Sequence, residues 1–333
     1  MATKTLKTAA APAVEAEQDL AKVVKKEKIK KIIVRLLPLI GLVFLVVLFY
    51  FLSDGKLVRT NNLKSLFNQA FSVFICAIAG VFVMSTGNLD FSLGANMGLC
   101  ATLACFAAFV STSLALPTAL LVGVAVGFLV GVIQIYAKLP SFIACLCMMF
   151  ILMALAQSLT GGTTKMLPPS MLGMKLDAVK IIVLIVYIAA MYILFEYTRV
   201  GKQLKAMGIS EETCIQSGIK TGRLRIIAYM LTGFAAGLAG YFTLLRTGCA
   251  SYQIGSTMTI DVIIAIVLGG MAVTGGSSSR ISAAIYGTLM TVVLDNGIVL
   301  SGLGGDAQQM IKGILFIIVV AISTKKDKNA VIA

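Results

Sequence analysis

The sequence predicts an all-α polytopic integral membrane protein. Of its 333 residues, 59% are hydrophobic and only 13% are charged, and its mean hydropathy is +0.97; these values lie far from those of a soluble domain. The apolar residues form long unbroken blocks, and about 20 apolar residues cross roughly 30 Å of hydrocarbon as a helix. A membrane barrel would instead show short segments in which apolar and polar residues alternate. We therefore expect helices as the spanning elements.

Residues 1–35 form a polar, lysine-rich tail that becomes strongly basic just before the first apolar run. We expect this tail to be cytoplasmic, with an interfacial helix in its second half, where valines and isoleucines alternate with lysines. Residues 36–323 form the predicted transmembrane domain, and residues 324–333 form a second basic tail.

About ten spans are predicted between the two tails. They are 36–52, 66–86, 93–112, 117–137, 142–160, 179–198, 224–246, 258–275, 281–302 and 306–323. When the sides alternate from a cytoplasmic N-terminus, the inner side receives twenty of the 28 lysines and arginines. The positive-inside rule then places both termini in the cytoplasm.

The longest predicted inner loop, residues 199–223, is polar and contains a helix-like stretch. Ser210 is a candidate N-cap, Glu211 and Glu212 follow in the first turn, and Gly218 stands at a plausible helix end. The loop is either a solvated connector held to the membrane by its basic residues or a segment on which a partner docks. We favour the second interpretation and call residues 199–223 the docking segment.

The sequence gives little support for enzymatic chemistry. It has no histidine and no tryptophan, and its seven cysteines lie mostly in apolar runs. It also lacks a Gly-x-x-x-x-Gly-Lys-Ser/Thr phosphate loop and a Gly-x-Ser-x-Gly nucleophile elbow. We therefore expect no catalytic residues, no metal site and no cofactor bound by this chain. The net charge of +14 is concentrated beside apolar runs, so we expect the lipid bilayer as its partner and no nucleic acid.

Polar residues at membrane depth are costly and usually face a cavity or another helix, so they are the candidates for a translocation path. The richest group follows the second predicted span and consists of Ser85, Thr86, Asn88, Asp90 and Ser92. Glycines interrupt this stretch, and unwound backbone is tolerated in a membrane where it lines protein or water. We therefore expect a broken or re-entrant helix near 85–94. The alternative is a short inner turn with an Asp cap.

Four more polar residues lie in the later spans. Asp261 and Asn296 are assigned to the candidate path. Asp295 and Lys312 are assigned to a structural pair across the last two helices, where each would satisfy the other. In an ion-coupled secondary carrier the same acids would instead form a proton relay.

Three longer segments carry a resemblance to a known family. They are TGNLDFSLGANMG at 86–98, GKQLKAMGISEETCIQSGIKTGRLRIIAYMLTGFAAGLAG at 201–240 and DVIIAIVLGGMAVTGGSSSRISAAIYGTLM at 261–290. In this order and spacing they resemble the permease subunits of ATP-binding-cassette importers of the ribose/xylose/galactoside type. The likeness extends from about residue 60 to the end of the chain.

The resemblance implies that the chain is a transporter subunit for a sugar and no enzyme. It implies a second copy of the chain, an extracytoplasmic sugar-binding protein and a separate cytosolic ATPase that uses ATP and Mg²⁺, all at the bacterial cytoplasmic (inner) membrane. The ATPase would contact the docking segment at Gly208, Glu211, Glu212, Ser217 and Gly218. Nucleosides or other polar small molecules are alternative substrates within the same family.

Overall fold

The computed structural model describes residues 38–173 and 177–327, in which helices are joined by turns and irregular segments and two short strands form one ribbon. The predicted tail 1–35 with its interfacial helix lies outside the described residues, as do residues 328–333 of the C-terminal tail. The helix Pro38–Leu52 comes first. It is followed by η1 (Lys56–Val58), α2 (Thr60–Met84), α3 (Leu93–Val110), η2 (Thr112–Leu114), α4 (Ala115–Tyr136), α5 (Ser141–Thr160), β1 (Lys165–Met166), α6 (Asp177–Tyr192), η3 (Ile193–Tyr197), α7 (Arg199–Met207), α8 (Glu211–Gln216), α9 (Thr221–Thr247), β2 (Cys249–Ala250), α10 (Met258–Leu268), α11 (Ile281–Leu300) and α12 (Gly305–Asp327).

Seven helical stretches among the described residues are long and apolar enough to cross a membrane. They are Thr60–Met84, Leu93–Val110, Thr112–Tyr136, Ser141–Thr160, Ala178–Tyr197, Thr221–Thr247 and Ile281–Leu300. Each overlaps a predicted span. The helices Pro38–Leu52 and Met258–Leu268 are apolar but shorter. The all-helical class is therefore confirmed, with seven candidate spans.

One predicted span is wrong in its extent. The stretch 258–275 is helical only from Met258 to Leu268, which is 11 residues and thus about 16 Å of helix at ~1.5 Å per residue. The helix ends at a glycine pair: Gly269 packs directly against the carbonyl of Ala283, and Gly270 adopts a φ of 93° that a helix cannot continue. Hydropathy alone does not register such a break, because the residues beyond it are still apolar.

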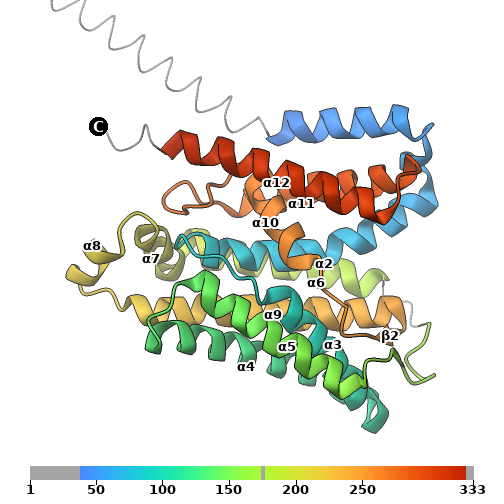
Figure 1. Cartoon of the computed structure of the whole chain (residues 1–333), viewed down its shortest axis with the longest axis horizontal. Helices are drawn as coiled ribbons and strands as arrows, with labels where there is room; N and C mark the ends of the chain where they lie inside the picture. Colours follow the sequence, from blue (N-terminus) through green and yellow to red (C-terminus); the bar gives the residue numbers. More distant parts are fainter. Residues whose placement is uncertain (1–37, 174–176, 328–333) are drawn as a thin grey trace, which may run out of the picture.

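The bundle has two ends that differ in character. At one end lie α7, α8 and the loop between α10 and α11, on the left-hand side of Figure 1; we call this the α8 end. At the other end β1 pairs with β2 in an antiparallel ribbon; we call this the ribbon end. Pro38 contacts Gly270, and the last turn of α12 lies on the same side in Figure 1. The end of the described chain is therefore on the side of α8.

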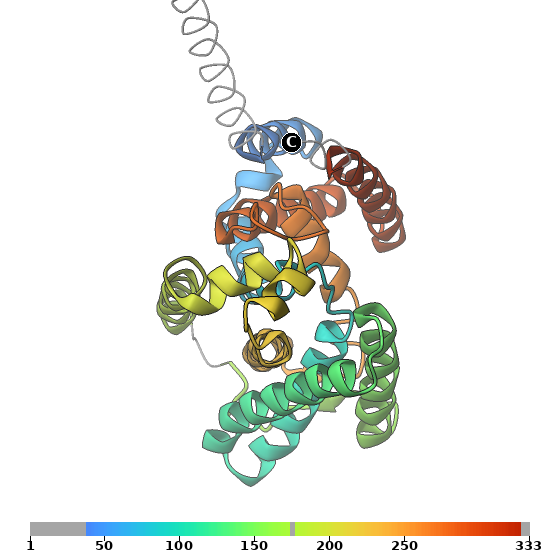
Figure 2. The same ribbon diagram turned by 90° about the vertical axis from the view of Figure 1, so that its left-hand side faces the viewer.

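Helix α9 lies near the centre of the bundle, as the end-on view of Figure 2 shows, with α4 and α5 on one side of it and α12 at the rim. Its closest neighbour is α4. Gly123 and Gly127 of α4 lie against the backbone of α9, and Gly233 and Gly237 of α9 lie against the backbone of α4. Small residues let helix backbones approach, which is a common basis of packing in membranes.

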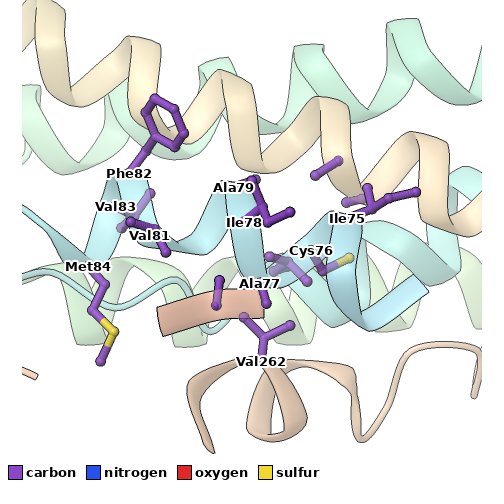
Figure 3. Packing of buried hydrophobic residues seen from close by; sticks show 14 of the residues in the cluster. Ile75, Cys76, Ala77, Ile78, Ala79, Val81, Phe82, Val83, Met84 and Val262 are labelled. Carbon is purple, nitrogen blue, oxygen red and sulfur yellow. The ribbon is translucent and has the colours of Figure 1, made fainter. Parts of the chain in front are cut away.

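Helix α2 carries much of the buried apolar core. Its side chains from Ile75 to Met84 are almost fully buried. Figure 3 shows this stretch with Val262 of α10 facing it. Gly80 makes room for Val262 and Ile266. The half-length helix α10 is thereby fixed against the second half of α2.

Candidate functional site

The predicted interruption near 85–94 is present in the structure. Helix α2 ends at Met84 and α3 begins at Leu93, and the residues between them form turns and extended backbone. Figure 1 shows this connection leaving α2 at the α8 end and returning toward the middle of the bundle, where α3 starts. We call residues 85–92 the polar segment.

Asp90 is the centre of the polar segment. Its Oδ1 accepts hydrogen bonds from the backbone N–H of Ser92 at 3.0 Å and from Ser92 Oγ at 2.6 Å. Its Oδ2 accepts a hydrogen bond from Thr232 Oγ1 at 2.7 Å. Thr232 lies near the midpoint of α9, so this contact places the carboxylate far from either end of that helix. These donors to Asp90 are all uncharged.

The other predicted residues of the polar segment bond within it. Asn88 donates from Nδ2 to Thr86 Oγ1 at 2.9 Å, Thr86 donates to the carbonyl of Val83 at 2.7 Å, and the buried Ser85 donates to the carbonyl of Phe82 at 2.8 Å. These bonds follow the chain closely and fix the local turn. They leave the amide of Asn88 at the wall of a cavity.

The beginning of the polar segment touches the docking segment. The carbonyl of Ser85 accepts a hydrogen bond from Gly276 N–H at 3.0 Å. Gly208, which follows α7, packs on both groups, and a Cβ at this position would collide with the Ser85 carbonyl and with Gly276. Three parts of the sequence thus meet at one point, so a displacement of α7 or α8 reaches the polar segment directly.

The far end of the polar segment meets α10. Gly94 N–H donates to Thr259 Oγ1 at 3.0 Å, and Thr259 donates to the carbonyl of Phe91 at 3.4 Å. Gly94 and Gly255 are in backbone contact. The first turns of α3 and α10 therefore face each other inside the bundle, each preceded by irregular chain.

The later polar residues form a separate charged cluster in α10, α11 and α12. Lys312 Nζ lies 2.6 Å from Asp261 Oδ1 and 2.8 Å from Asp295 Oδ1, and the three side chains are 7%, 9% and 14% exposed. The Asp295–Lys312 pair was predicted, whereas Asp261 was assigned to the path and here joins the pair. We call these three residues the charged cluster.

Asn296 has its own partner. Asn62 Nδ2 donates to Asn296 Oδ1 at 2.7 Å, and Asn296 Nδ2 donates to Asn62 Oδ1 at 3.0 Å. This reciprocal amide pair joins α2 to α11. The structure thus divides the seven predicted path residues among the polar segment, the charged cluster and this amide pair.

The docking segment folds as two short helices. Ser210 caps α8 by accepting from Thr213 N–H at 3.3 Å, as predicted, and Gly218 follows the helix with a φ of 77°. Glu211 Oε2 lies 2.7 Å from a terminal nitrogen of Arg225, which ties α8 to the first turn of α9. On the outer surface of α8, Glu212 and Ser217 are exposed and Ile215 is 56% exposed.

A cavity of about 710 Å³ opens at the α8 end between α8, the first turn of α9, the α4–α5 turn and the polar segment. Its lining includes Asn88, Gln134, Lys138, Glu211 and Arg225. Sites for small molecules in proteins have volumes of about 300–1,000 Å³.

Three residues of this region were missed by the reasoning from sequence. Thr232 and Gln134 lie in long apolar helices, and Arg225 lies at the start of another predicted span. Gln134 had a usable signal, because a buried glutamine in an apolar helix needs a partner. Thr232 had none, since a threonine in a membrane helix usually satisfies its hydroxyl with its own backbone.

Comparisons with known proteins agree with one another. Residues 62–320 match the family described as "Branched-chain amino acid transport system / permease component". The ribose import permease protein RbsC of Escherichia coli (strain K12) is 30% identical over 285 residues, covering 80% of this chain and 87% of the relative. RbsC of Bacillus subtilis (strain 168) is 29% identical over 306 residues, covering 87% and 92%.

A third relative has a different named cargo. The autoinducer 2 import system permease protein LsrC of Yersinia enterocolitica (serotype O:8 / biotype 1B) is 30% identical over 272 residues, covering 79% of this chain and 75% of the relative. No solved structure matches the chain at a significant level. The matches confirm the resemblance to sugar import permeases that segments 86–98, 201–240 and 261–290 predicted.

Proposed function

Because the chain belongs to the family of branched-chain amino acid transport system permease components, we propose that it is the membrane-spanning permease of an ATP-binding-cassette importer for a sugar. The observation that carries this proposal is its 30% identity to a ribose import permease over 80% of the chain. The family description names amino acids, whereas the relatives named above import ribose or autoinducer 2. Membership therefore identifies a permease, and the curated relatives favour a sugar as its cargo.

We propose ten spans with both termini in the cytoplasm. The seven long helices, the helix Pro38–Leu52 and α12 account for nine crossings. The tenth combines α10 with the irregular residues 251–257 before it, which start beside the ribbon. Two observations support this topology: the excess of Lys and Arg on the predicted inner side, and the position of the last turn of α12 on the same side as α8 in Figure 1.

We propose that the sugar passes along the polar segment. Irregular backbone inside a membrane protein is tolerated where it lines protein or water, and Asp90 gives this stretch a carboxylate held by uncharged donors. ATP-driven movement of α8 would shift Ser85 through Gly208 and change the shape of the segment. The complex would in this way alternate between outward-open and inward-open states.

The proposed complex contains partners that supply what this chain lacks. A cytosolic ATPase that uses ATP and Mg²⁺ would dock on α8, whose exposed Ile215 offers an apolar contact among polar neighbours. An extracytoplasmic binding protein would deliver the sugar at the ribbon end, and a second copy of this chain would complete the passage. The proposed location is the bacterial cytoplasmic membrane.

Reconstituted transport tests the function. Proteoliposomes that contain this chain, its ATPase and its binding protein are expected to accumulate labelled D-ribose when ATP is present, and the chain alone is expected to accumulate none. A competition series with other pentoses, hexoses and nucleosides would identify the preferred substrate. Accumulation driven by a proton or sodium gradient without the ATPase would overturn the proposal in favour of a secondary carrier.

Docking is tested separately by Glu212→Lys. Glu212 is exposed on α8, so reversal of its charge should leave the fold intact while it weakens the complex with the ATPase roughly threefold to tenfold, as rim charges do. Co-purification of the ATPase and its stimulated turnover are the measurements. The matched control is Asp306→Lys, which changes another exposed acid, outside α8, and equal loss in both variants would argue against docking at α8.

A further inference from the structure

The cavity at the α8 end is electropositive. Lys138 and Arg225 line it, and so do the first residues of two long helices, Ser141 of α5 and Thr221 of α9. Neither helix has a side chain that caps its first turn, so both present N–H groups at their positive ends. Among the described residues that line the cavity, Glu211 is the one acid, and it is already paired with Arg225.

The wall of the cavity also contains two polar atoms that no described group satisfies. Gln134 is 4% exposed, and its Oε1 has no hydrogen-bond partner in the described part of the chain; the same is true of Arg225 Nε. Buried polar groups in proteins are almost always paired. Gln134 Oε1 can accept a hydrogen bond, and Arg225 Nε–H can donate one. The terminal torsion of glutamine is soft enough to turn its amide toward a ligand.

We propose that this cavity binds a phosphorylated sugar from the side of the docking segment. The phosphate would lie between Lys138, Arg225 and the two helix N-termini, since helix N-termini combined with cations form anion sites. The sugar hydroxyls would meet Gln134, because a hydroxyl both donates and accepts. The sugar half of the ligand rests on the proposed function, whereas the anionic half rests on the cavity alone.

The position of the cavity gives this ligand an effect on α8. Arg225 holds α8 through Glu211, and a phosphate in the cavity competes with Glu211 for the same guanidinium. Occupancy therefore loosens the link between α8 and α9. In the proposed transporter, a sugar phosphate formed after import would slow further import by acting on the element that receives the ATPase.

Cysteine labelling tests the site in the complete transporter. The permease–ATPase complex is placed in nanodiscs of zwitterionic lipid without nucleotide, in a Cys147→Ser background because Cys147 is exposed. Ser141→Cys reports the cavity and Thr163→Cys reports the ribbon end. D-ribose 5-phosphate is expected to slow maleimide labelling at position 141 and not at position 163, and D-ribose or inorganic phosphate alone should protect less.

Two substitutions probe the recognition. Lys138 is exposed, so Lys138→Gln should fold normally and weaken protection by roughly threefold to tenfold, the effect of one charged contact. Lys56→Gln, at an exposed lysine outside the cavity, is the matched control. Gln134→Leu should weaken protection by D-ribose 5-phosphate without changing protection by inorganic phosphate, with Gln309→Leu as its control.

Several results would overturn the proposal. The first is no protection by D-ribose 5-phosphate. The second is equal protection by inorganic phosphate, which would mean an adventitious ion only. The third is equal protection by D-ribose, which would mean a release site for neutral sugar. If anionic lipid in the nanodisc abolishes the protection by D-ribose 5-phosphate, the cavity would be assigned to a lipid headgroup. ATP-driven uptake of D-ribose by the same complex in proteoliposomes with its binding protein reports the proposed function independently, so its failure is distinguishable from failure of the site.

Discussion

Two acidic sites among the described residues are held by different chemistry. In the charged cluster, two carboxylates contact one ammonium group, and all three side chains are largely removed from solvent. In the polar segment, Asp90 accepts hydrogen bonds from Ser92 and Thr232, which carry no charge. One acidic site is closed by an opposite charge, and the other is stabilised by dipoles alone.

This difference separates a structural role from a functional one. The charged cluster joins α10 to α11 and α12, so its partners come from three helices and fix their relative positions. The polar segment joins α2 to α3 by irregular backbone, is in contact with Gly208 and Gly276, and borders the cavity at the α8 end. Changes in the first site should act on stability, and changes in the second should act on transport.

Lys312→Met should have the largest effect on stability. It leaves Asp261 and Asp295 buried beside each other without a cation, and removal of one partner from a buried ion pair costs about 3–5 kcal/mol. Thermal unfolding in detergent, followed by loss of monodisperse protein, is the measurement. The triple variant with Asp261→Asn and Asp295→Asn should recover much of the loss, and an unchanged unfolding midpoint for Lys312→Met alone would remove the basis of the comparison.

Asp90→Asn should lower transport much more than stability, the opposite of what we expect for Lys312→Met. It keeps the shape of the side chain, and no charge is left without its partner, so we expect a loss of about 1–3 kcal/mol from the changed hydrogen bonds. ATP-driven uptake should fall much more than stability. Thr232→Val, which removes one donor to Asp90, is the companion variant. If Asp90→Asn unfolds the protein as readily as Lys312→Met does, the polar segment is a structural site as well.

The sequence predicts the helices of this fold well, for a physical reason. Hydropathy over about 20 residues is a local property, and the long helices from α2 to α11 lie where apolar runs predict them. The predicted end of the span 258–275 was wrong because the true end of α10 depends on the packing of Gly269 against Ala283, a contact between segments that are distant in the sequence. The capped helix α8 was predicted because its cap and its acidic first turn are local signals.

The candidate site is predictable only where it is contiguous. Residues 85–92 stand out because polar residues and glycines gather in one short stretch of an apolar chain. Their neighbours Thr232 and Gly208 come from far along the sequence, and a single sequence contains no information on such contacts. The same reason explains Asp261, which was assigned to the path by its position in a span, although its contact in the structure is Lys312.

Asn296→Leu tests whether the amide pair belongs with the charged cluster. Asn296 is 7% exposed and bonds reciprocally with Asn62, so its removal should cost about 1 kcal/mol and leave uptake per folded molecule unchanged. The single variants and the double variant with Asn62→Leu form a cycle that isolates the pairwise energy. A loss of uptake without a loss of stability would instead return Asn296 to the translocation path.

Glu211→Gln should have the smallest effect on stability, and it gives the sharpest test of whether a contact can act on transport without acting on stability. The side chains of Arg225 and Glu211 are 18% and 41% exposed, and a pair so accessible to water contributes about 0–1 kcal/mol. Because the contact ties α8 to α9, its loss should still lower the ATP-driven uptake of sugar per ATP hydrolysed. Lys205→Gln, which breaks the similarly exposed pair with Glu196 outside α8, is the matched control. A change in coupling for Glu211→Gln alone would show that a contact of little value to stability transmits motion from the docking segment to the polar segment.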